Sequence, residues 1–173
     1  DPRAASETQT GTLIAPYRVG VNHDHFFSYR IDMDVDGVDN NFVRQRLVAT
    51  EQPDGAPRQG IWTVQQEHML TEQQAQTVMK VEKPALLTFA STTAKNAMGY
   101  FTSYQLIFPN THPLVTLDDA IYQRAGFLKN NLWVTRYKPD EIFSTGFAVN
   151  QSDVGVGLPQ YAADDETIEN TDL

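Results

Sequence analysis

The clearest alternation of apolar and polar residues lies between His23 and Asp36. The odd positions of this stretch are His23, His25, Phe27, Tyr29, Ile31, Met33 and Val35, whereas the even positions, apart from Phe26, are polar or charged. A period of two is typical of a β-strand with one apolar and one polar face. The pattern therefore predicts a strand over this whole stretch.

Other apolar stretches, bounded by Gly, Pro and polar clusters, predict further short strands. They lie at residues 41–49, 61–70, 85–90, 100–108 and 131–137. Residues 36–40 predict a turn that makes 41–49 the return strand of a hairpin. Residues 117–128 predict a short helix capped by Asp118.

Many short strands with little helix are typical of an all-β protein, here a large β-sandwich. The chain of 173 residues is long enough to bury a hydrophobic core. Neither an internal repeat nor a linker divides it, so residues 1–173 are expected to form part of one domain.

The alternation also places the side chains that could bind metals on two different faces of the predicted strand. Along one strand, His23 and His25 would share the apolar face, while Asp32 and Asp34 would share the opposite face. Imidazole suits copper, zinc or iron, and carboxylate oxygen suits calcium or magnesium. We therefore expect two separate metal sites, although strand histidines and solvated turn aspartates are the simpler alternative.

Two known metal motifs do not fit this stretch. Asp32, Asp34 and Gly37 have the offsets of a calcium-binding helix–loop–helix, but the twelfth position is Val43, where a bidentate Glu is required. A metal-binding double-stranded barrel requires a Glu shortly after the second His, and residues 27–31 contain none. The helix–loop–helix interpretation is rejected, and the barrel interpretation is weak.

Composition narrows the partners and the possible metal ligands. The net charge of −9 argues against nucleic acid and anionic membranes as partners, and no apolar run is long enough to span a bilayer. The absence of cysteine excludes disulfides, Cys-based zinc sites and a thiol nucleophile. Only four histidines can hold a transition metal. No targeting signal is recognisable, so the compartment stays open.

Five segments, taken in order, carry a more specific signal than any of them alone. They are Gly11-Thr12-Leu13-Ile14, His23-x-His25, Asp32-Met33-Asp34-Val35-Asp36-Gly37, Leu132-Trp133-Val134-Thr135-Arg136-Tyr137 and Glu169-Asn170-Thr171-Asp172. Together they resemble the catalytic domain of copper amine oxidases, which use copper and topaquinone to oxidise primary amines. The resemblance spans nearly the whole chain.

The resemblance implies three sets of metal ligands. His23 and His25 resemble two of the three copper ligands of the family. Asp32, Asp34 and Asp172 resemble side-chain ligands of a calcium-type site, with backbone carbonyls from Met33 and Leu173. A second, more peripheral cation site is implied by Glu72, Asp164, Glu166 and the carbonyl of Tyr161.

The sequence also departs from the family pattern. None of its seven tyrosines lies in the Asn-Tyr-Asp/Glu context from which the family forms its quinone. The resemblance places that tyrosine and the catalytic Asp base upstream of this sequence, and the third copper His just beyond Leu173. The expectation is a fragment truncated at both ends and inactive alone.

For the parent protein, the resemblance implies oxidative deamination of primary amines by a homodimer. Amine and dioxygen would be consumed, and aldehyde, ammonia and hydrogen peroxide released, with the redox chemistry supplied by the cofactors. The alternative is a non-enzymatic metal-binding β-sandwich module, and the missing quinone precursor supports that alternative.

Overall fold

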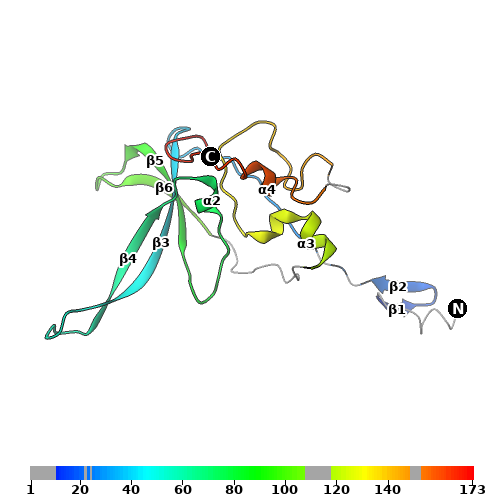
Figure 1. The fold of residues 1–173 in the computed structure, drawn as a ribbon, viewed down its shortest axis with the longest axis horizontal. Helices are drawn as coiled ribbons and strands as arrows, with labels where there is room; N and C mark the ends of the chain where they lie inside the picture. The colour runs from blue at the N-terminus through cyan, green and yellow to red at the C-terminus, as the bar shows by residue number, and fades with distance from the viewer. Residues whose placement is uncertain (1–10, 22, 24, 108–117, 149–152) are drawn as a thin grey trace.

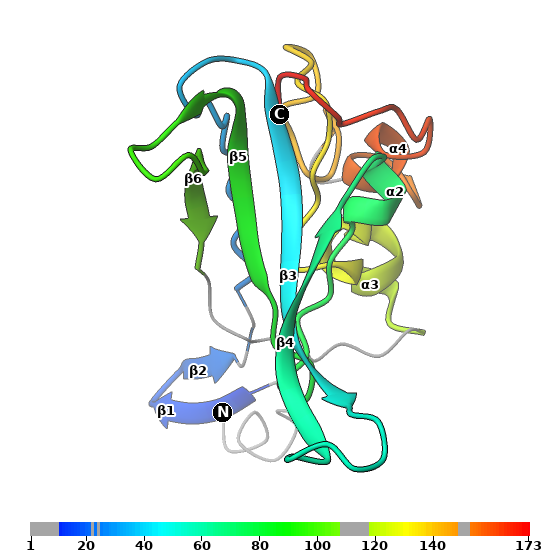
Figure 2. The same cartoon turned by 90° about the vertical axis from the view of Figure 1, so that its left-hand side faces the viewer.

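The main feature of the computed structural model is a four-stranded antiparallel sheet with strand order β4-β3-β5-β6 (Figures 1 and 2). The structure describes residues 11–21, 23, 25–107, 118–148 and 153–173. The strands of the sheet are β3 (Asn40–Glu51), β4 (Gly60–His68), β5 (Leu86–Lys95) and β6 (Phe101–Leu106), and a separate hairpin is formed by β1 (Gly11–Ala15) and β2 (Arg18–Val21). The prediction of an all-β fold is confirmed.

The helices of the described residues are short. They are α2 (Glu72–Ala75), α3 (Ala120–Arg124), the 3₁₀-helix η1 (Gly126–Lys129) and α4 (Leu158–Tyr161). The helix predicted over residues 117–128 is divided into α3 and η1, and residue 117 lies outside the described part. Asp119, rather than Asp118, caps α3, because its Oδ1 accepts a hydrogen bond from the amide of Ile121 at 2.8 Å. No helix in the described ranges has the length and apolar character needed to cross a bilayer.

Strand β3 has two halves with different surroundings. Its first half, Asn40–Gln45, pairs with β5, whereas the pairing with β4 continues from Val43 to Glu51. Beyond Gln45 the described part of the sheet therefore has two strands, which we call the β3–β4 arm (residues 46–51 and 60–65). Figures 1 and 2 show this arm projecting from the rest of the molecule.

The hydrophobic core lies against the four-stranded part of the sheet. Phe42 and Phe89 face each other across β3 and β5, with ring centroids 5.0 Å apart. The buried members of the core are Val35, Phe42, Met69, Ala75, Leu87, Phe89, Val134, Ile168 and Leu173. The core thus joins the sheet to α2, to the 131–137 segment and to the C-terminal residues. Burial of each large apolar side chain stabilises the folded state by about 1.5–3 kcal/mol.

The predicted strand between His23 and Asp36 is wrong for this structure. The described residues from His23 to Asp36 belong to no strand, and within the described chain no strand pairs with them. Phe27, Tyr29 and Ile31 are 75%, 82% and 56% exposed, and among the described residues of this stretch only Val35 is buried. The alternation is present, but a strand needs a neighbour to receive its backbone hydrogen bonds.

Other predicted elements are corrected in smaller ways. The 41–49 strand is present as part of β3, but it pairs with β4 and β5 and not with the segment before the turn. Residues 131–137 form only an isolated bridge, between Leu132 and Thr77. The strands predicted at 61–70, 85–90 and 100–108 correspond to β4, β5 and β6, although residue 108 is outside the described part.

Candidate metal sites

The two predicted copper-ligand histidines lie side by side on the surface. The Nε2 atoms of His23 and His25 are 2.8 Å apart and both rings are exposed. Two nitrogen ligands at about 2.0–2.1 Å from one metal ion lie roughly 3 Å from each other. The spacing of the two imidazoles is therefore compatible with a shared ion.

A backbone carbonyl selects the tautomer of His23. Its Nδ1 lies 3.1 Å from the carbonyl oxygen of Val21. Because a carbonyl oxygen only accepts, Nδ1 carries the proton and Nε2 keeps its lone pair. A metal-binding histidine commonly has such a partner on its second nitrogen. In the metal-free pair, the proton between the two Nε2 atoms must then belong to His25.

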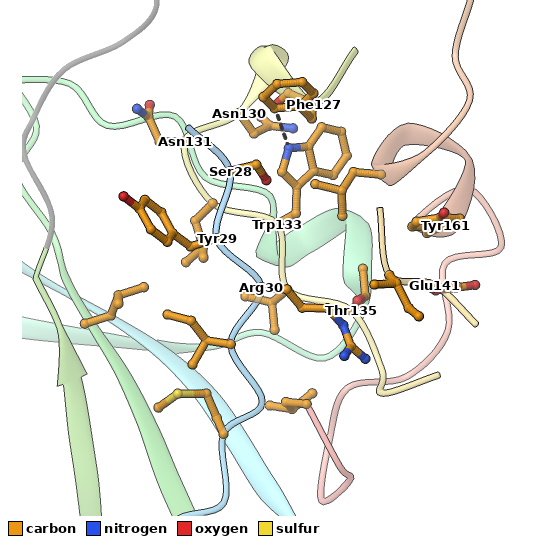
Figure 3. Close-up of a pocket in the computed structure, with 18 of the residues that line it drawn as sticks. Ser28, Tyr29, Arg30, Phe127, Asn130, Asn131, Trp133, Thr135, Glu141 and Tyr161 are labelled. Atoms are coloured by element: carbon orange, nitrogen blue, oxygen red, sulfur yellow. Dashed lines mark hydrogen bonds between the residues drawn. The ribbon is translucent and has the colours of Figure 1, made fainter. Parts of the chain in front are cut away.

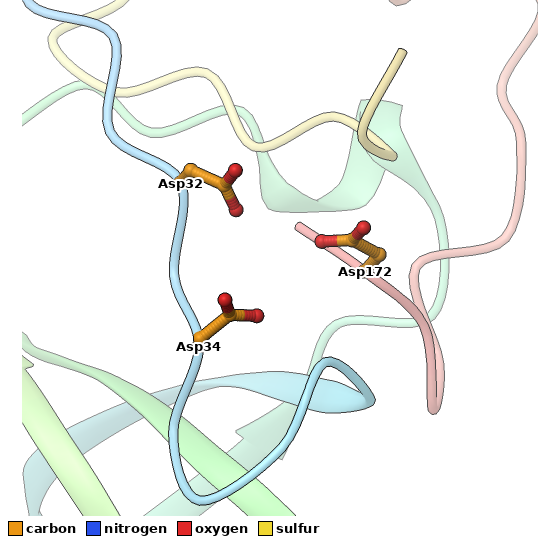
Figure 4. A group of neighbouring side chains, drawn as sticks. All are labelled: Asp32, Asp34 and Asp172. Carbon is orange, nitrogen blue, oxygen red and sulfur yellow. The ribbon is translucent and has the colours of Figure 1, made fainter. Parts of the chain in front are cut away.

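The three predicted calcium-site aspartates also meet in space. Carboxylate oxygens of Asp32, Asp34 and Asp172 lie within 4.8 Å of one another. Figure 4 shows the three side chains directed toward one another from the 32–34 segment and the C-terminal segment. The fold thus brings Asp172, from the far end of the sequence, to the neighbouring carboxylates of Asp32 and Asp34, and three converging carboxylates suit a hard cation.

Backbone hydrogen bonds hold the two segments in this position. The amide of Met33 donates to the carbonyl of Leu173 at 3.0 Å, and the amide of Tyr137 donates to the carbonyl of Asp172 at 2.9 Å. The carbonyl of Leu173, one of the two predicted backbone ligands, is therefore already engaged by Met33, although a carbonyl oxygen has a second lone pair. Metal binding by the carbonyls of Met33 and Leu173 stays a prediction.

Electrostatics makes this group unfavourable without a counter-ion. Burial is the largest cause that raises the pKa of Asp172, followed by the charges of Asp32 and Asp34. The Oδ1 atom of Asp172 is buried and has no hydrogen-bond partner in the described structure. A buried carboxylate oxygen without a donor is costly, and a divalent cation would remove that cost.

The residues predicted for the peripheral cation site form a second acidic group. Carboxylate oxygens of Glu72, Asp164 and Glu166 lie within 4.8 Å of one another. Glu72 lies in α2 and is fully buried. Tyr161 is the last residue of α4 and lies three residues before Asp164 in the sequence. Cation binding by its backbone carbonyl stays a prediction.

Glu72 is the most perturbed carboxyl of this group. Burial, as the largest cause, raises its pKa from 4.5 to about 7, against the hydrogen bond that its Oε1 accepts from the amide of Arg136 at 3.0 Å. Its Oε2 atom has no hydrogen-bond partner among the described residues. The pKa of Asp164 is lowered, chiefly by its hydrogen bond with Lys138. Glu72 therefore holds a proton more readily than Asp164 does.

Two contributors to these groups were not predicted from the sequence. Asn40 is fully buried, accepts from the amide of Val35 at 3.2 Å and donates to the carbonyl of Gly37 at 2.8 Å. Lys138 places its Nζ among the carboxylates of the peripheral group, 2.9 Å from Asp164 Oδ2. No local pattern singles out Lys138, because Asp164 and Glu166 are distant in sequence. The side-chain partners of Asn40 are only three and five residues away, but its role depends on the conformation of the folded turn.

A pocket of about 670 Å³ lies between the unpaired 25–33 segment and residues 127–138. Figure 3 shows Tyr29, Arg30 and Trp133 among its lining residues. The indole nitrogen of Trp133 donates to the carbonyl of Phe127 at 2.9 Å, and so holds the ring in the wall of the pocket. The pocket offers apolar and aromatic surface beside the segment that lacks a strand partner.

Comparison with known families finds one match along almost the whole chain. Residues 2–173 match the copper amine oxidase enzyme domain. A primary amine oxidase from Klebsiella aerogenes is 37% identical over 99% of this chain and 23% of that protein. A peroxisomal copper-containing amine oxidase (alpha 2) from Arabidopsis thaliana is 34% identical over 94% of this chain and 24% of that protein. The chain spans about a quarter of the length of these curated relatives.

Solved structures of the same fold agree with this match. A copper-containing benzylamine oxidase from Hansenula polymorpha superposes with a TM-score of 0.69 at 22% identity, over 82% of this chain and 22% of that one. A lysyl oxidase from Pichia pastoris superposes with a TM-score of 0.65 at 21% identity, over 80% of this chain and 20% of that one. At these identities the superpositions show the shared fold.

Proposed function

Because the chain belongs to the copper amine oxidase family, we propose that the full-length protein is a primary-amine oxidase. It would convert a primary amine, dioxygen and water to an aldehyde, ammonia and hydrogen peroxide. The match to the enzyme domain over residues 2–173 carries this proposal. The amine and dioxygen are its proposed substrates.

Within this activity, His23 and His25 are the proposed copper ligands of the chain. Their Nε2 atoms are 2.8 Å apart, and the tautomer of His23 leaves a lone pair on its Nε2. His25 would bind copper through Nε2 as its other neutral tautomer, with the proton on Nδ1. Bound copper and topaquinone would supply the redox chemistry of the reaction. A third imidazole is expected from outside this sequence.

Copper content, quinone content and turnover test this proposal in the full-length protein. We expect a positive quinone-directed redox stain and amine-dependent peroxide release with a panel of primary amines. His23→Ala and His25→Ala should each lose bound copper and the stain. His68→Ala, which changes an exposed histidine at the end of β4, should keep both.

Three results would count against the proposal. Unchanged copper content in the double variant His23→Ala/His25→Ala would remove the ligand assignment. A full-length protein that holds copper but does not stain or turn over would favour the non-enzymatic metal-binding module. The 173-residue chain alone is expected to be inactive, because no tyrosine lies in the quinone-forming context, so turnover by that chain would also contradict the proposal.

The proposed role of Asp32, Asp34 and Asp172 is to bind calcium or a similar divalent cation. Their carboxylates converge, and Asp172 has a raised pKa and a buried oxygen without a donor. A cation that binds only the folded state raises the free energy of unfolding by mass action. The site would thus stabilise the position of the C-terminal segment.

Calcium removal tests this site. EDTA should lower the melting temperature of the full-length protein, and calcium should restore it. Asp34→Asn should reduce this calcium effect, whereas Asp54→Asn, in the exposed loop between β3 and β4, should leave it unchanged. Identical melting curves in EDTA and in excess calcium would show that the aspartates are only solvated.

Glu72, Asp164 and Glu166 form a proposed second, peripheral cation site. Their carboxylate oxygens converge, and the buried Oε2 of Glu72 has no donor within the described structure. A hard cation is the ligand that would satisfy this oxygen. The carbonyl of Tyr161 is the proposed fourth ligand.

The proposed assembly is a homodimer. On one face of the β3–β4 arm, Leu47 is opposite Val64 and Ala49 is opposite Trp62. All four side chains are exposed. An apolar face on a projecting hairpin is costly in water and is typical of a protein–protein contact. A second copy of the chain is the proposed partner of this face.

A further inference from the structure

Lys138 occupies the centre of the peripheral acidic group. Its Nζ lies 2.9 Å from Asp164 Oδ2, 3.0 Å from Glu166 Oε2 and 3.4 Å from Glu141 Oε1. Its hydrogen bond with Asp164 and its contact with Glu166 raise the pKa of its ammonium above its ordinary value. Lys138 therefore stays charged at neutral pH and supplies a positive charge that belongs to the chain itself.

The ammonium contacts oxygens that a divalent cation would need. Asp164 and Glu166 are two of the three side-chain ligands of the proposed peripheral site, and Lys138 lies within hydrogen-bonding distance of both. A divalent ion at bonding distance from those oxygens would lie within a few ångströms of the ammonium, where like charges repel strongly. The two cations therefore exclude each other.

The side chain of Lys138 can leave without disturbing the fold. It is 26% exposed, and its long aliphatic stem carries a compact head group. The backbone is held separately, since Arg30 donates to the carbonyl of Lys138 at 3.3 Å. Only the side chain has to rotate toward solvent when the site is filled by an ion.

We propose that Lys138 is a built-in competitor for the peripheral cation site, so that a divalent cation binds there only by displacing its ammonium. The proposal rests on the peripheral site formed by Glu72, Asp164 and Glu166. The buried Oε2 of Glu72 has no donor among the described residues, so Lys138 leaves part of the site unsatisfied. The chain thus keeps an acidic site that tolerates the absence of metal and still accepts it at high concentration.

The experiment compares calcium binding by full-length variants in equilibrium dialysis. Lys138→Met removes the charge and keeps the stem, Lys138→Gln is a second uncharged variant, and Lys138→Arg keeps the charge. Lys80→Met is the matched control at an exposed lysine. We expect both uncharged variants to bind one additional calcium ion about tenfold or more tightly than the wild type. The Arg variant and the Lys80 control should match the wild type.

A further variant assigns the additional ion to the peripheral group. Adding Glu166→Gln to Lys138→Met should abolish the additional ion and leave binding at Asp32, Asp34 and Asp172 unchanged. In EDTA, Lys138→Met should melt below the wild type and recover with calcium, because the substitution removes the counter-charge that Lys138 supplies to the acidic group. This melting experiment gives a readout that is independent of activity.

The outcomes separate failure of the competition from failure of the site. Equal affinity of wild type and uncharged variants for the additional ion would overturn the competition and leave the site standing. Tighter binding by Lys138→Arg, equal to that of Lys138→Met, would also overturn it. No additional ion in any variant would overturn the peripheral site, and the competition with it.

Discussion

Asn40 is the residue that connects the turn after the aspartate pair to the rest of the molecule. Its side chain bonds the amide of Val35 and the carbonyl of Gly37, and its backbone pairs in both directions with Thr171. Asp36 and Gly37 both adopt positive φ, at 52° and 135°, so the predicted turn is present but strained at its non-glycine position. A buried amide that satisfies two backbone groups can hold such a turn.

Replacement of Asn40 by Ala should therefore be destabilising. The amide of Val35, a buried residue, would lose its acceptor, and the cost of one such orphaned group is about 1–3 kcal/mol. Urea denaturation of the full-length protein measures this loss. Gln66→Ala, at an exposed position of β4, is the control and should change the free energy of unfolding little. Equal stability of the two variants would contradict the role of Asn40.

Glu72 gives the molecule a pH dependence when metal is absent. Its pKa in the folded protein is about 7, above the ordinary value of 4.5. Between these values the folded state binds more protons than the unfolded state, so stability falls as the pH rises from 4.5 through 7. We expect this decline in EDTA to be smaller in Glu72→Gln than in the wild type.

The measured quantity is the difference between the wild type and Glu72→Gln in the slope of stability against pH. A difference is needed because Asp172 also has a raised pKa and contributes to the slope of both proteins. Glu82→Gln changes an exposed glutamate and should keep the wild-type slope of stability against pH. Thermal melting across this pH range distinguishes the variants. A Glu72→Gln protein with the full wild-type slope would show that another group causes the decline.

Among the elements, the unpaired 25–31 segment stands out because its sequence is that of a strand. Phe27, Tyr29 and Ile31 alternate with polar residues, yet they are exposed beside the pocket of Figure 3. Such a segment presents unpaired backbone groups and an apolar face, and both are costly in water. The chain spans about a quarter of its curated relatives, so further chain is the expected neighbour.

Hydrogen exchange tests this expectation. In the full-length protein, the amides of residues 25–31 should be protected as strongly as those of β5, whereas in the 173-residue chain they should exchange rapidly. The first half of β3, which pairs with two strands in this structure, should be protected in both proteins. Rapid exchange of 25–31 in the full-length protein would show that the segment remains unpaired.

At the scale of the whole molecule, the projecting β3–β4 arm determines the expected assembly. Trp62 is 74% exposed on the apolar face that it forms with Leu47, Ala49 and Val64. Trp62→Glu should weaken a homodimer of the full-length protein, because a charge would be buried in the contact. Gln65→Glu adds the same charge to the opposite face of the arm and should leave the dimer intact. Sedimentation velocity across a range of concentrations separates these results.

A monomeric wild-type protein would contradict the proposed homodimer directly. Equal dimerisation of the Trp62 and Gln65 variants would place the contact elsewhere on the surface. Because the arm contributes little to the core, neither substitution should change the melting temperature of the monomer appreciably. This makes the arm a suitable place to separate assembly from folding.

The sequence by itself determined whatever depends on neighbouring residues. The two-residue spacing of His23 and His25 was enough to predict adjacent imidazoles, and Asp36-Gly37 was enough to predict a turn. The all-β class followed from many short apolar stretches, and the motifs identified the family. These properties are local, since two-residue alternation and turn geometry are set within a few bonds of backbone.

Local patterns did not decide which distant residues meet or which strands pair. The family resemblance had grouped Asp172 with Asp34, but nothing in the sequence around Asp172 explains that grouping. In the structure the two residues come together through the pairing of Asn40 with Thr171 and of Met33 with Leu173. The proposed role of Lys138 likewise depends on distant residues, because its ammonium contacts the carboxylates of Asp164 and Glu166. The 25–31 segment has the pattern of a strand, but strand formation requires hydrogen bonds from a second segment. Alternation specifies which faces a segment has, and the packing of the whole chain decides what those faces contact.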